Sequence, residues 1–402
     1  MANVIVTPDI IANEALMQLE NNSVMGKLVH RQYKNEFVKV GDTVSVRKPV
    51  KFAVTDGATR SNQDVQEAVT PFKVDKRKHV SWSFSTNDLT LSVEEYSERY
   101  IKPAMIQLAN QVDADLCALY KNVFTNVGTA GTTPTTFLHF GAAAKRLNQL
   151  AVPQEERRLV LDPSASLTAA DMLKGLYNPE LVKGAVRGMS IGPLAGFDTY
   201  MDQNIVDHTI GTWGTTPLVA GASQSVTYAN ATHTYGSTSQ TLNIDGLTAT
   251  TGTVKAGDVF TIAGVYSVNP VSKATSAVLQ EFTCQALATA DGTGAATLTI
   301  SPAIITSGAF QTVSAAPADN AAITKVANHT ANLAFHKNAF GLVVCPLELP
   351  DGAAFKARQS ANGWSVRVVK DYDIDADTDI IRLDILYGTK ALYPELACRL
   401  LG

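Results

Sequence analysis

Three groups of residues have side chains of the types that active-site chemistry uses, and their spacing decides whether they could act together. The first group is a serine motif. Residues 188–192 (GMSIG) match the G-x-S-x-G pattern of a nucleophilic serine. That motif requires a strand before the serine and a helix after it, so that a strained turn presents the hydroxyl group. Here Glu180–Arg187 has a helical or loop-like pattern and Pro193 follows at once. Catalysis by Ser190 is therefore the less favoured interpretation.

The second group is a run of aspartates spaced like the ligands of a calcium-binding loop: Asp373, Asp375, Asp377, Asp379 and Asp384. Such a loop needs a glycine where this chain has Thr378, and it is flanked by helices, whereas the flanks here have strand patterns. The spacing favours a solvated turn between two strands, and weak surface binding of a divalent ion stays open.

The histidines and cysteines form the third group, and they are scattered. Of the 7 His, only His329 and His336 are close in sequence, and the 4 Cys include no C-x-x-C pair. This pattern predicts surface or satisfied core histidines and reduced, buried cysteines. The sequence also contains no Walker loop and no dinucleotide fingerprint, so it predicts no metal, no cofactor and no enzymatic activity.

A basic cluster is the remaining candidate site. Two β patterns, at 38–46 and 72–84, flank a long polar segment and predict a protruding hairpin with little core of its own. Its basic residues are Arg47, Lys48 and Lys51 on one side and Lys76, Arg77 and Lys78 on the other. They form either a solvated face or an ion-pairing surface for an acidic neighbour such as the helix start at Glu94, Glu95 and Glu98. All nine residues are candidates for contact between subunits.

Composition limits the class of protein. The chain has 402 residues, 45% hydrophobic and 17% charged, which predicts several globular domains. A net charge of -4 argues against a free protein that binds nucleic acid through a basic field. No apolar run is long enough for a membrane span, and the N-terminus has no secretory signal pattern, so we expect a soluble chain made in a reducing cytoplasm.

The central segment from Trp213 to Thr330 differs in composition from the sequence on either side. It contains 8 of the 70 charged residues but 22 threonines. Short β patterns recur in it between glycine-containing turns, for example at 241–244, 259–262, 281–284 and 296–300. This spacing predicts a small antiparallel barrel or sandwich, inserted as an independent module into a host fold.

The flanking sequence predicts a mixed α/β host. Thr7-Pro8-Asp9 carries the cap, the proline and the acid of a helix start, and the apolar spacing continues to Asn22. Ser92 to Phe124 has the longest helical pattern, and Pro103 interrupts it. Shorter helices are predicted at 141–150 and 168–176, and strands at 158–162, 340–345, 366–369 and 380–386.

Five segments are similar to a known family: Val40–Pro49 (VGDTVSVRKP), Leu194–Asn204 (LAGFDTYMDQN), Asn332–Pro350 (NLAFHKNAFGLVVCPLELP), Val366–Gly402, and Thr251–Val265 (TGTVKAGDVFTIAGV) within the insert. In their order along the chain, these segments resemble the major capsid protein of tailed double-stranded-DNA phages, with the Hong Kong 97-type fold. The resemblance is closest to the Salmonella podophage coat-protein subgroup, which carries an inserted β domain.

The resemblance implies an α+β, Hong Kong 97-like fold with an inserted all-β barrel or sandwich. Its expected parts are an N-terminal arm (1–36), an extended loop or β hairpin (37–85), a spine helix with peripheral domain (86–137), the axial domain (138–212 and 331–352), the insert (213–330), and peripheral C-terminal strands (353–402).

The function implied is structural. Copies of the subunit would form pentamers and hexamers with a scaffolding protein and a portal protein, and would enclose double-stranded DNA without sequence-specific binding. The shell would assemble in the host cytoplasm and remain in the virion; the need for a decoration protein stays open. Two other hypotheses are a threonine-rich β adhesin or virion-associated carbohydrate-binding protein, and a hydrolase using Ser190.

Overall fold

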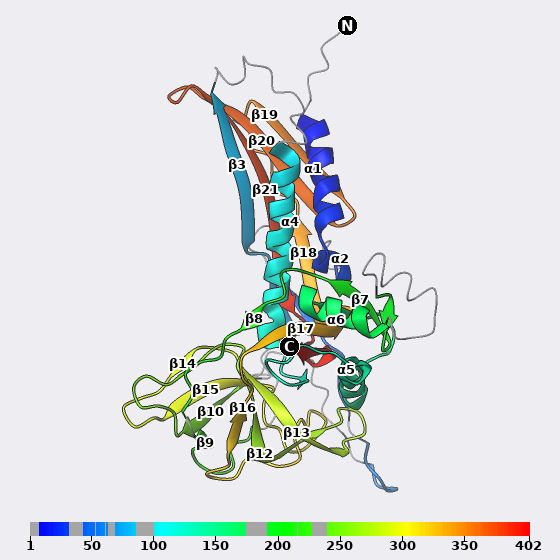
Figure 1. Ribbon diagram of the computed structural model, residues 1–402, viewed down its shortest axis with the longest axis vertical. Helices are drawn as coiled ribbons and strands as arrows, with labels where there is room; N and C mark the ends of the chain where they lie inside the picture. Colours follow the sequence, from blue (N-terminus) through cyan, green and yellow to red (C-terminus); the bar gives the residue numbers. More distant parts are fainter. Residues whose placement is uncertain are drawn as a thin grey trace. The chain divides into compact units, whose positions relative to one another are not determined.

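The computed structural model describes residues 8–31, 43–52, 54–60, 62, 69–85, 100–173, 191–214, 216–226 and 239–402. The chain divides into two units, each assembled from segments far apart in sequence. The first comprises Met1–Val44, Phe72–Leu116 and Gly341–Lys390, and the second Ser45–Pro71, Cys117–Phe340 and Ala391–Gly402. Both contain helices and strands, which confirms the predicted α+β class (Figure 1).

A five-stranded sheet forms the first unit's framework. Its order is β18-β21-β20-β19, with β3 paired to β21. The strands are β18 (Phe340–Cys345), β19 (Phe355–Ala361), β20 (Trp364–Asp373), β21 (Thr378–Ala391) and β3 (Lys76–Ser85). Strands β20 and β21 pair antiparallel up to Asp373 and Thr378, which confirms that the aspartate-rich segment is a turn between two strands.

The position of β3 corrects the predicted hairpin. β3 pairs antiparallel with β21 over ten residues, from Lys76 opposite Tyr387 to Ser85 opposite Thr378. The sequence analysis had placed 72–84 as one arm of a hairpin facing Arg47. Instead, β1 (Thr43–Arg47) pairs with β2 (Val69–Lys73) in a separate two-stranded sheet. The hairpin therefore ends near Lys73, and β3 is an integral strand of the larger sheet.

Helices α1 (Pro8–Asn22) and α2 (Met25–Leu28) lie at the start of the described chain. α1 spans the predicted range and contacts β19 and β20 through a face that includes Ala15, Leu16 and Leu19. After it, the buried carboxylate of Asp113 accepts hydrogen bonds from Ser23 Oγ at 2.9 Å and Gly26 N at 3.0 Å. Gly26 is required here because a Cβ would lie 2.7 Å from the buried Trp364 ring.

The long predicted helix is described from residue 100 onward. A π-type turn at Tyr100 and Ile101 precedes α4 (Lys102–Cys117), and the 3-10 helix η3 (Ala118–Asn122) continues it. The irregular turn lies just before Pro103, where the sequence predicts an interruption. The predicted apolar positions are buried, including Met105, Leu108, Ala109, Val112 and Leu116. Residues 92–99 lie outside the described residues.

The second unit contains a seven-stranded sheet and, as described below, a barrel. Its order is β4-β22-β17-β5-β7-β6, with β8 paired to β17. The strands are β4 (Asn126–Val127), β22 (Ala397–Leu401), β17 (His329–His336), β5 (Arg157–Leu161), β7 (Phe197–Met201), β6 (Pro193–Leu194) and β8 (Asp207–His208), with the 3-10 turns η4 (Lys337–Ala339) and η5 (Pro394–Leu396).

Helices α5 (Phe137–Gln149) and α6 (Pro163–Leu173) contribute to the core of this sheet. Both begin four or five residues before their predicted starts. In α6 the reason is Asp162, whose carboxylate accepts hydrogen bonds from the backbone N–H groups of Ser164 and Ala165. Asp162-Pro163 is thus a cap followed by proline at the first helical position, the same signal that identified α1.

The charge-poor segment forms a six-stranded antiparallel barrel, as predicted. The order is β16-β12-β13-β15-β10-β9, and a bridge between Leu218 and Ala322 closes β9 onto the start of β16. Its strands are β9 (Leu218–Val219), β10 (Gln240–Asp245), β12 (Val259–Val268), β13 (Thr275–Cys284), β15 (Ala296–Ser301) and β16 (Ile323–Lys325), beside the small pair β11 (Thr253–Val254) and β14 (Ala288–Thr289) (Figure 1).

The barrel has its own hydrophobic core. Alternate residues of its strands point inward, among them Leu242, Ile244, Phe260, Phe282 and Leu298. The four cysteines, Cys117, Cys284, Cys345 and Cys398, are buried and are not joined in disulfides, as predicted. Among the described helices, none is both long and apolar enough to cross a membrane.

Candidate functional site: a buried polar network at the neck of the barrel

The predicted basic residues are divided between the two units: Arg47, Lys48 and Lys51 belong to the second, and the basic residues of β3 to the first. Arg47 is exposed on β1, whereas Lys48 is buried, with its Nζ 4.2 Å from the Tyr393 ring centroid. Burial lowers the pKa of Lys48 to about 7, and the nearby Lys51 adds to the effect against the opposing charge of Glu395. Lys48 therefore has its contacts within the second unit.

The basic residues of β3 have partners inside the first unit. Lys76 Nζ lies 3.1 Å from Asp115, and Arg77 lies 3.5 Å from Asp384, while Lys78 is half-buried opposite Ile385. Within the chain, the acids that pair with Lys76 and Arg77 are thus on α4 and β21. Glu94, Glu95 and Glu98, the acids that the sequence suggested, lie outside the described residues.

Two other predicted sites can be placed in part. Ser190 lies outside the described residues. Asp384, the last position of the calcium-like run, is buried in β21, and its carboxylate is paired with Arg367 at 2.5 Å and Arg382 at 2.7 Å. Within the described ranges, no group of three or more His, Cys, Asp or Glu is arranged to hold a metal ion.

The richest polar network lies where the chain enters and leaves the barrel, a place the sequence did not single out. We call residues 206–211 and 327–331 the neck. β8 pairs antiparallel with the start of β17 there, and His208 lies directly opposite His329. Their ring centroids are 5.3 Å apart. The two imidazoles are thus neighbours although 121 positions separate them in sequence.

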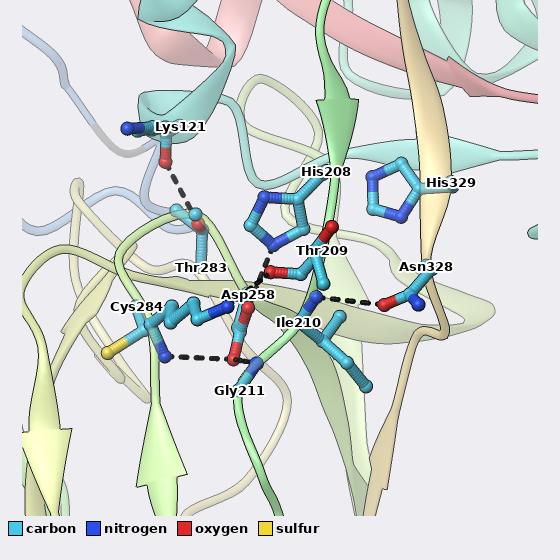
Figure 2. A network of polar contacts seen from close by, with 12 residues as sticks. Lys121, His208, Thr209, Ile210, Gly211, Asp258, Thr283, Cys284, Asn328 and His329 are labelled. Carbon is cyan, nitrogen blue, oxygen red and sulfur yellow. Dashed lines mark hydrogen bonds and ion pairs between the residues drawn. The ribbon is translucent and has the colours of Figure 1, made fainter.

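Asp258, just before β12, is the centre of the network (Figure 2). Its carboxylate is 1% exposed and lies 2.8 Å from His208 Nε2. It also accepts hydrogen bonds from Trp213 Nε1 at 2.8 Å and from the backbone N–H groups of Gly211 at 3.0 Å and Lys255 at 2.9 Å. One side chain therefore connects the incoming strand to the barrel.

The network holds Asp258 in its charged form. Burial raises the pKa of this carboxyl, but the hydrogen bonds from His208, Trp213 and the backbone outweigh it, so the pKa is lowered. His208 is also fully engaged, because its Nδ1 lies 2.8 Å from the Tyr120 hydroxyl. Both nitrogens of His208 thus have partners from different elements.

The hydrogen bonding of His329 differs from that of His208. It is 3% exposed, and its Nδ1 lies 2.8 Å from the carbonyl oxygen of Ala327. Its Nε2 has no hydrogen-bond partner among the described residues. Burial lowers the pKa of His329 to about 4. His329 is therefore neutral in the folded protein near neutral pH.

Two buried arginines tie the barrel to the seven-stranded sheet beside the neck. Arg399 of β22 donates to the carbonyl oxygen of Gly257 at 2.8 Å and to Thr283 Oγ1 at 3.3 Å, and it stacks over Tyr120. Arg146 of α5 forms an ion pair with Glu281 of β13 at 2.8 Å. Thr283 Oγ1 in turn donates to the carbonyl oxygen of Lys121 (Figure 2).

These contacts hold the barrel on the seven-stranded sheet. Each of the four donors to Asp258 belongs to the neck or to the barrel segment, so the hydrogen bonds of this carboxylate join parts of the fold. The sequence contained one usable signal: Asp258 is among the 8 charged residues of the barrel segment and follows Lys255-Ala-Gly inside an apolar strand pattern. A charge in such surroundings indicates a buried partner.

The family model described as "P22 coat protein - gene protein 5" matches residues 2–402. No curated protein sequence matches. Among solved structures, the chain is similar to one from Mycobacterium phage Che8 (14% identity, covering 94% of this chain and 90% of that one, TM-score 0.49). It is also similar to the capsid structure of cyanophage P-SCSP1u (12%, 94% and 87%, TM-score 0.44) and to the CUS-3 coat protein I-domain (28%, 27% and 94%, TM-score 0.20).

Proposed function

The chain belongs to the P22 coat protein family, and from that membership we propose that it builds an icosahedral shell around the double-stranded DNA of a tailed phage. It is a major capsid protein and a component of the virion, and copies of it assemble with one another. The observation that carries this conclusion is the extent of the match, residues 2–402, which includes both units and the barrel. A carbohydrate-binding adhesin is not supported.

The finer assignments are part of the proposal. Pentamers and hexamers with a Hong Kong 97-type fold would assemble in the host cytoplasm with a scaffolding protein and a portal protein, without catalytic chemistry in the subunit. A net charge of -4 supports enclosure of DNA without tight binding to it. The domain boundaries predicted from sequence, including the insert at 213–330, belong to this proposal as well.

The loop between β1 and β2 is the best candidate for contact with a neighbouring subunit. A sheet of two five-residue strands is marginally stable by itself. The same loop exposes two large apolar side chains, Phe52 at 61% and Val54 at 96%. Exposed apolar residues beside the charges of Arg47 and Lys51 are typical of a surface that another protein covers.

Assembly of the full-length chain tests the function. We expect shells visible by electron microscopy, and rapid sedimentation, when the chain is produced with the scaffolding protein of the same phage. If the chain stays monomeric with and without that protein, the proposed assembly is wrong.

A double variant tests the loop. Phe52→Ser with Val54→Ser should lower the yield of shells at least tenfold, while the urea midpoint of the isolated subunit stays within error. Val271→Ser is the matched control, because Val271 is 76% exposed on the barrel. Equal loss of assembly in both variants would assign no special role to the loop.

A further inference from the structure

The neck combines two features that make it sensitive to protons. First, the barrel is connected to its host through two neighbouring strand segments, and their pairing places His208 against His329. Second, backbone contacts across the neck depend on this pairing: Ala331 N donates to the carbonyl oxygen of Val206, and Ile210 N donates to Asn328 Oδ1. Anything that separates the two histidines also breaks these contacts.

The two histidines differ in the partners of their ring nitrogens. His208 Nε2 lies 2.8 Å from the carboxylate of Asp258. A protonated His329 would gain an N–H at Nε2 that has no acceptor among the described residues. The groups around His329 are the His208 ring from β8, Arg399 from β22, and Asp258 from the loop before β12.

The charges around His329 add to this cost. The Arg399 guanidinium and His208 disfavour a proton on His329, whereas the Ala327 carbonyl and the Asp258 carboxylate favour it. The Asp258 carboxylate already holds four donors, including His208 Nε2. Tyr120, from η3, is bonded to His208 and stacked under Arg399, so its hydroxyl group and its ring are both engaged by other residues. The proton therefore favours a state in which His329 reaches water.

We propose that the neck is an acid-sensitive junction: protonation of His329 opens the β8–β17 pair and loosens the barrel from the seven-stranded sheet while the barrel itself stays folded. This goes beyond the assembly function, because it concerns how the subunit's parts are coupled. It would let mildly acidic conditions change the freedom of the barrel within a subunit whose two hydrophobic cores remain intact.

The barrel can stay folded when the neck opens. Its core is a separate cluster that includes Phe260, Phe282 and Ile300, and six antiparallel strands surround it. The contact of Arg146 with Glu281 lies outside the neck and contains no histidine. Opening at His329 is thus a local event, of the kind that hydrogen exchange resolves from global unfolding.

Hydrogen exchange on the full-length subunit at several pH values tests the junction. After correction for intrinsic exchange rates, protection of the Ile210, Gly211 and Ala331 amides should fall about 30-fold between pH 6.5 and pH 4.5, because one proton is taken up only by the open state. Amides of β12 and β13 should keep their protection. An unchanged neck, or loss of protection throughout the barrel, would overturn the proposal.

A matched pair of variants assigns the effect to one ring. His329→Asn keeps a side-chain donor for the Ala327 carbonyl but cannot gain a proton, so its neck protection should be independent of pH over this range. His79→Asn replaces an exposed histidine on β3 and should behave like the parent chain. If His329→Asn retains the parent's pH dependence, another group is responsible and the proposal fails.

Direct titration keeps the test valid even if His329→Asn does not fold. In the unmodified chain with isotopically labelled histidines, the His329 ring signal should titrate near pH 4. Neck protection should fall below about pH 6.5 and level off where this ring titrates, because the closed state also takes up the proton there. A His329 signal that titrates at pH 6.5 or above would contradict the proposed junction.

Discussion

Two buried aspartates, one in each unit, are satisfied in opposite ways. Asp384 in the five-stranded sheet is 0% exposed and lies among three guanidinium groups, those of Arg367, Arg382 and Arg77. Asp258 at the barrel is 1% exposed, and its donors are two backbone N–H groups, an indole and an imidazole.

The difference follows from composition, and it predicts how the stability of each unit depends on salt and on pH. The segment that contains Asp258 has 8 of the chain's 70 charged residues, so backbone and ring donors replace arginines. Fixed dipoles in a buried site are little affected by salt, whereas partly exposed ion pairs are screened by it. The second unit should thus be sensitive to pH at the neck, and the first unit to ionic strength.

Removing the Asp258 carboxylate should have the largest effect. Asp258→Ala leaves four donors without their acceptor, three of them in buried hydrogen bonds. Each buried donor costs about 1–3 kcal/mol, so we expect a loss of about 4 kcal/mol in the stability of the second unit. Urea unfolding followed by Trp213 fluorescence, with Trp82 and Trp364 replaced by Phe, measures it. Asp198→Ala, at an exposed position of β7, is the control. Equal effects of the two substitutions would refute the central role of Asp258.

Acid should destabilise the second unit next. Burial lowers the folded-state pKa of His329 to about 4, below its ordinary value of 6.5. Its contribution is therefore complete above pH 6.5 and is lost as the pH falls toward 4, by about 3 kcal/mol. In the same fluorescence assay, His329→Asn should abolish this slope.

The first unit should not share that pH dependence. Burial raises the pKa of Asp384, but Arg367 and Arg382 outweigh it, and the pKa is held below 3.8. Its contribution is thus present above pH 3.8 and is lost only as the pH falls further. Segment-resolved hydrogen exchange at pH 7 and pH 4.5 distinguishes the units. Parallel losses in both units would remove the contrast.

A smaller effect is expected when Asp384 is neutralised. Asp384→Asn leaves Arg367, Arg382 and Arg77 repelling one another, but their partial exposure lets water compensate, so we expect about 2 kcal/mol. Because the parent's ion pairs are screened in 1 M salt, the difference between parent and variant should shrink there. Exchange of β20 and β21 amides reports it. A difference that does not change with salt would indicate that packing, not charge, dominates.

Loss of the partly exposed ion pair between Lys76 and Asp115 should have the smallest effect on stability. The side chains are 33% and 19% exposed, and such pairs contribute about 0.5 kcal/mol. Lys76→Gln should shift the urea midpoint of the first unit only slightly more than Lys102→Gln, an exposed change on α4. A loss above about 2 kcal/mol would show that this pair belongs with the buried group.

Local signals in the sequence predicted much of the fold. The cap and proline before α1, and the period-two patterns of β10, β12, β13 and β15, lie within a few residues of the elements they determine. Asp162-Pro163 carries the same kind of signal, and α6 begins there, five residues before the start at 168 that its sequence pattern predicts.

The pairings between distant segments could not be predicted in this way. β3 was assigned to a hairpin because its nearest strand pattern is local, whereas its partner β21 lies some 300 positions away. His208 and His329 are each unremarkable in sequence and become a pair only when the barrel closes on itself. Long-range register follows from tertiary packing, which a single sequence does not display.

Arg399 and Arg146 give the attachment of the barrel a consequence for how relatives diverge. Both guanidiniums are buried, and both reach from the host into the barrel for their acceptors. In a lineage that lost the barrel, these two positions would retain buried cations with no acceptor, a costly state. Presence of the barrel and basic residues at these positions should therefore be inherited together, whereas the exposed loops of the barrel are free to change in length.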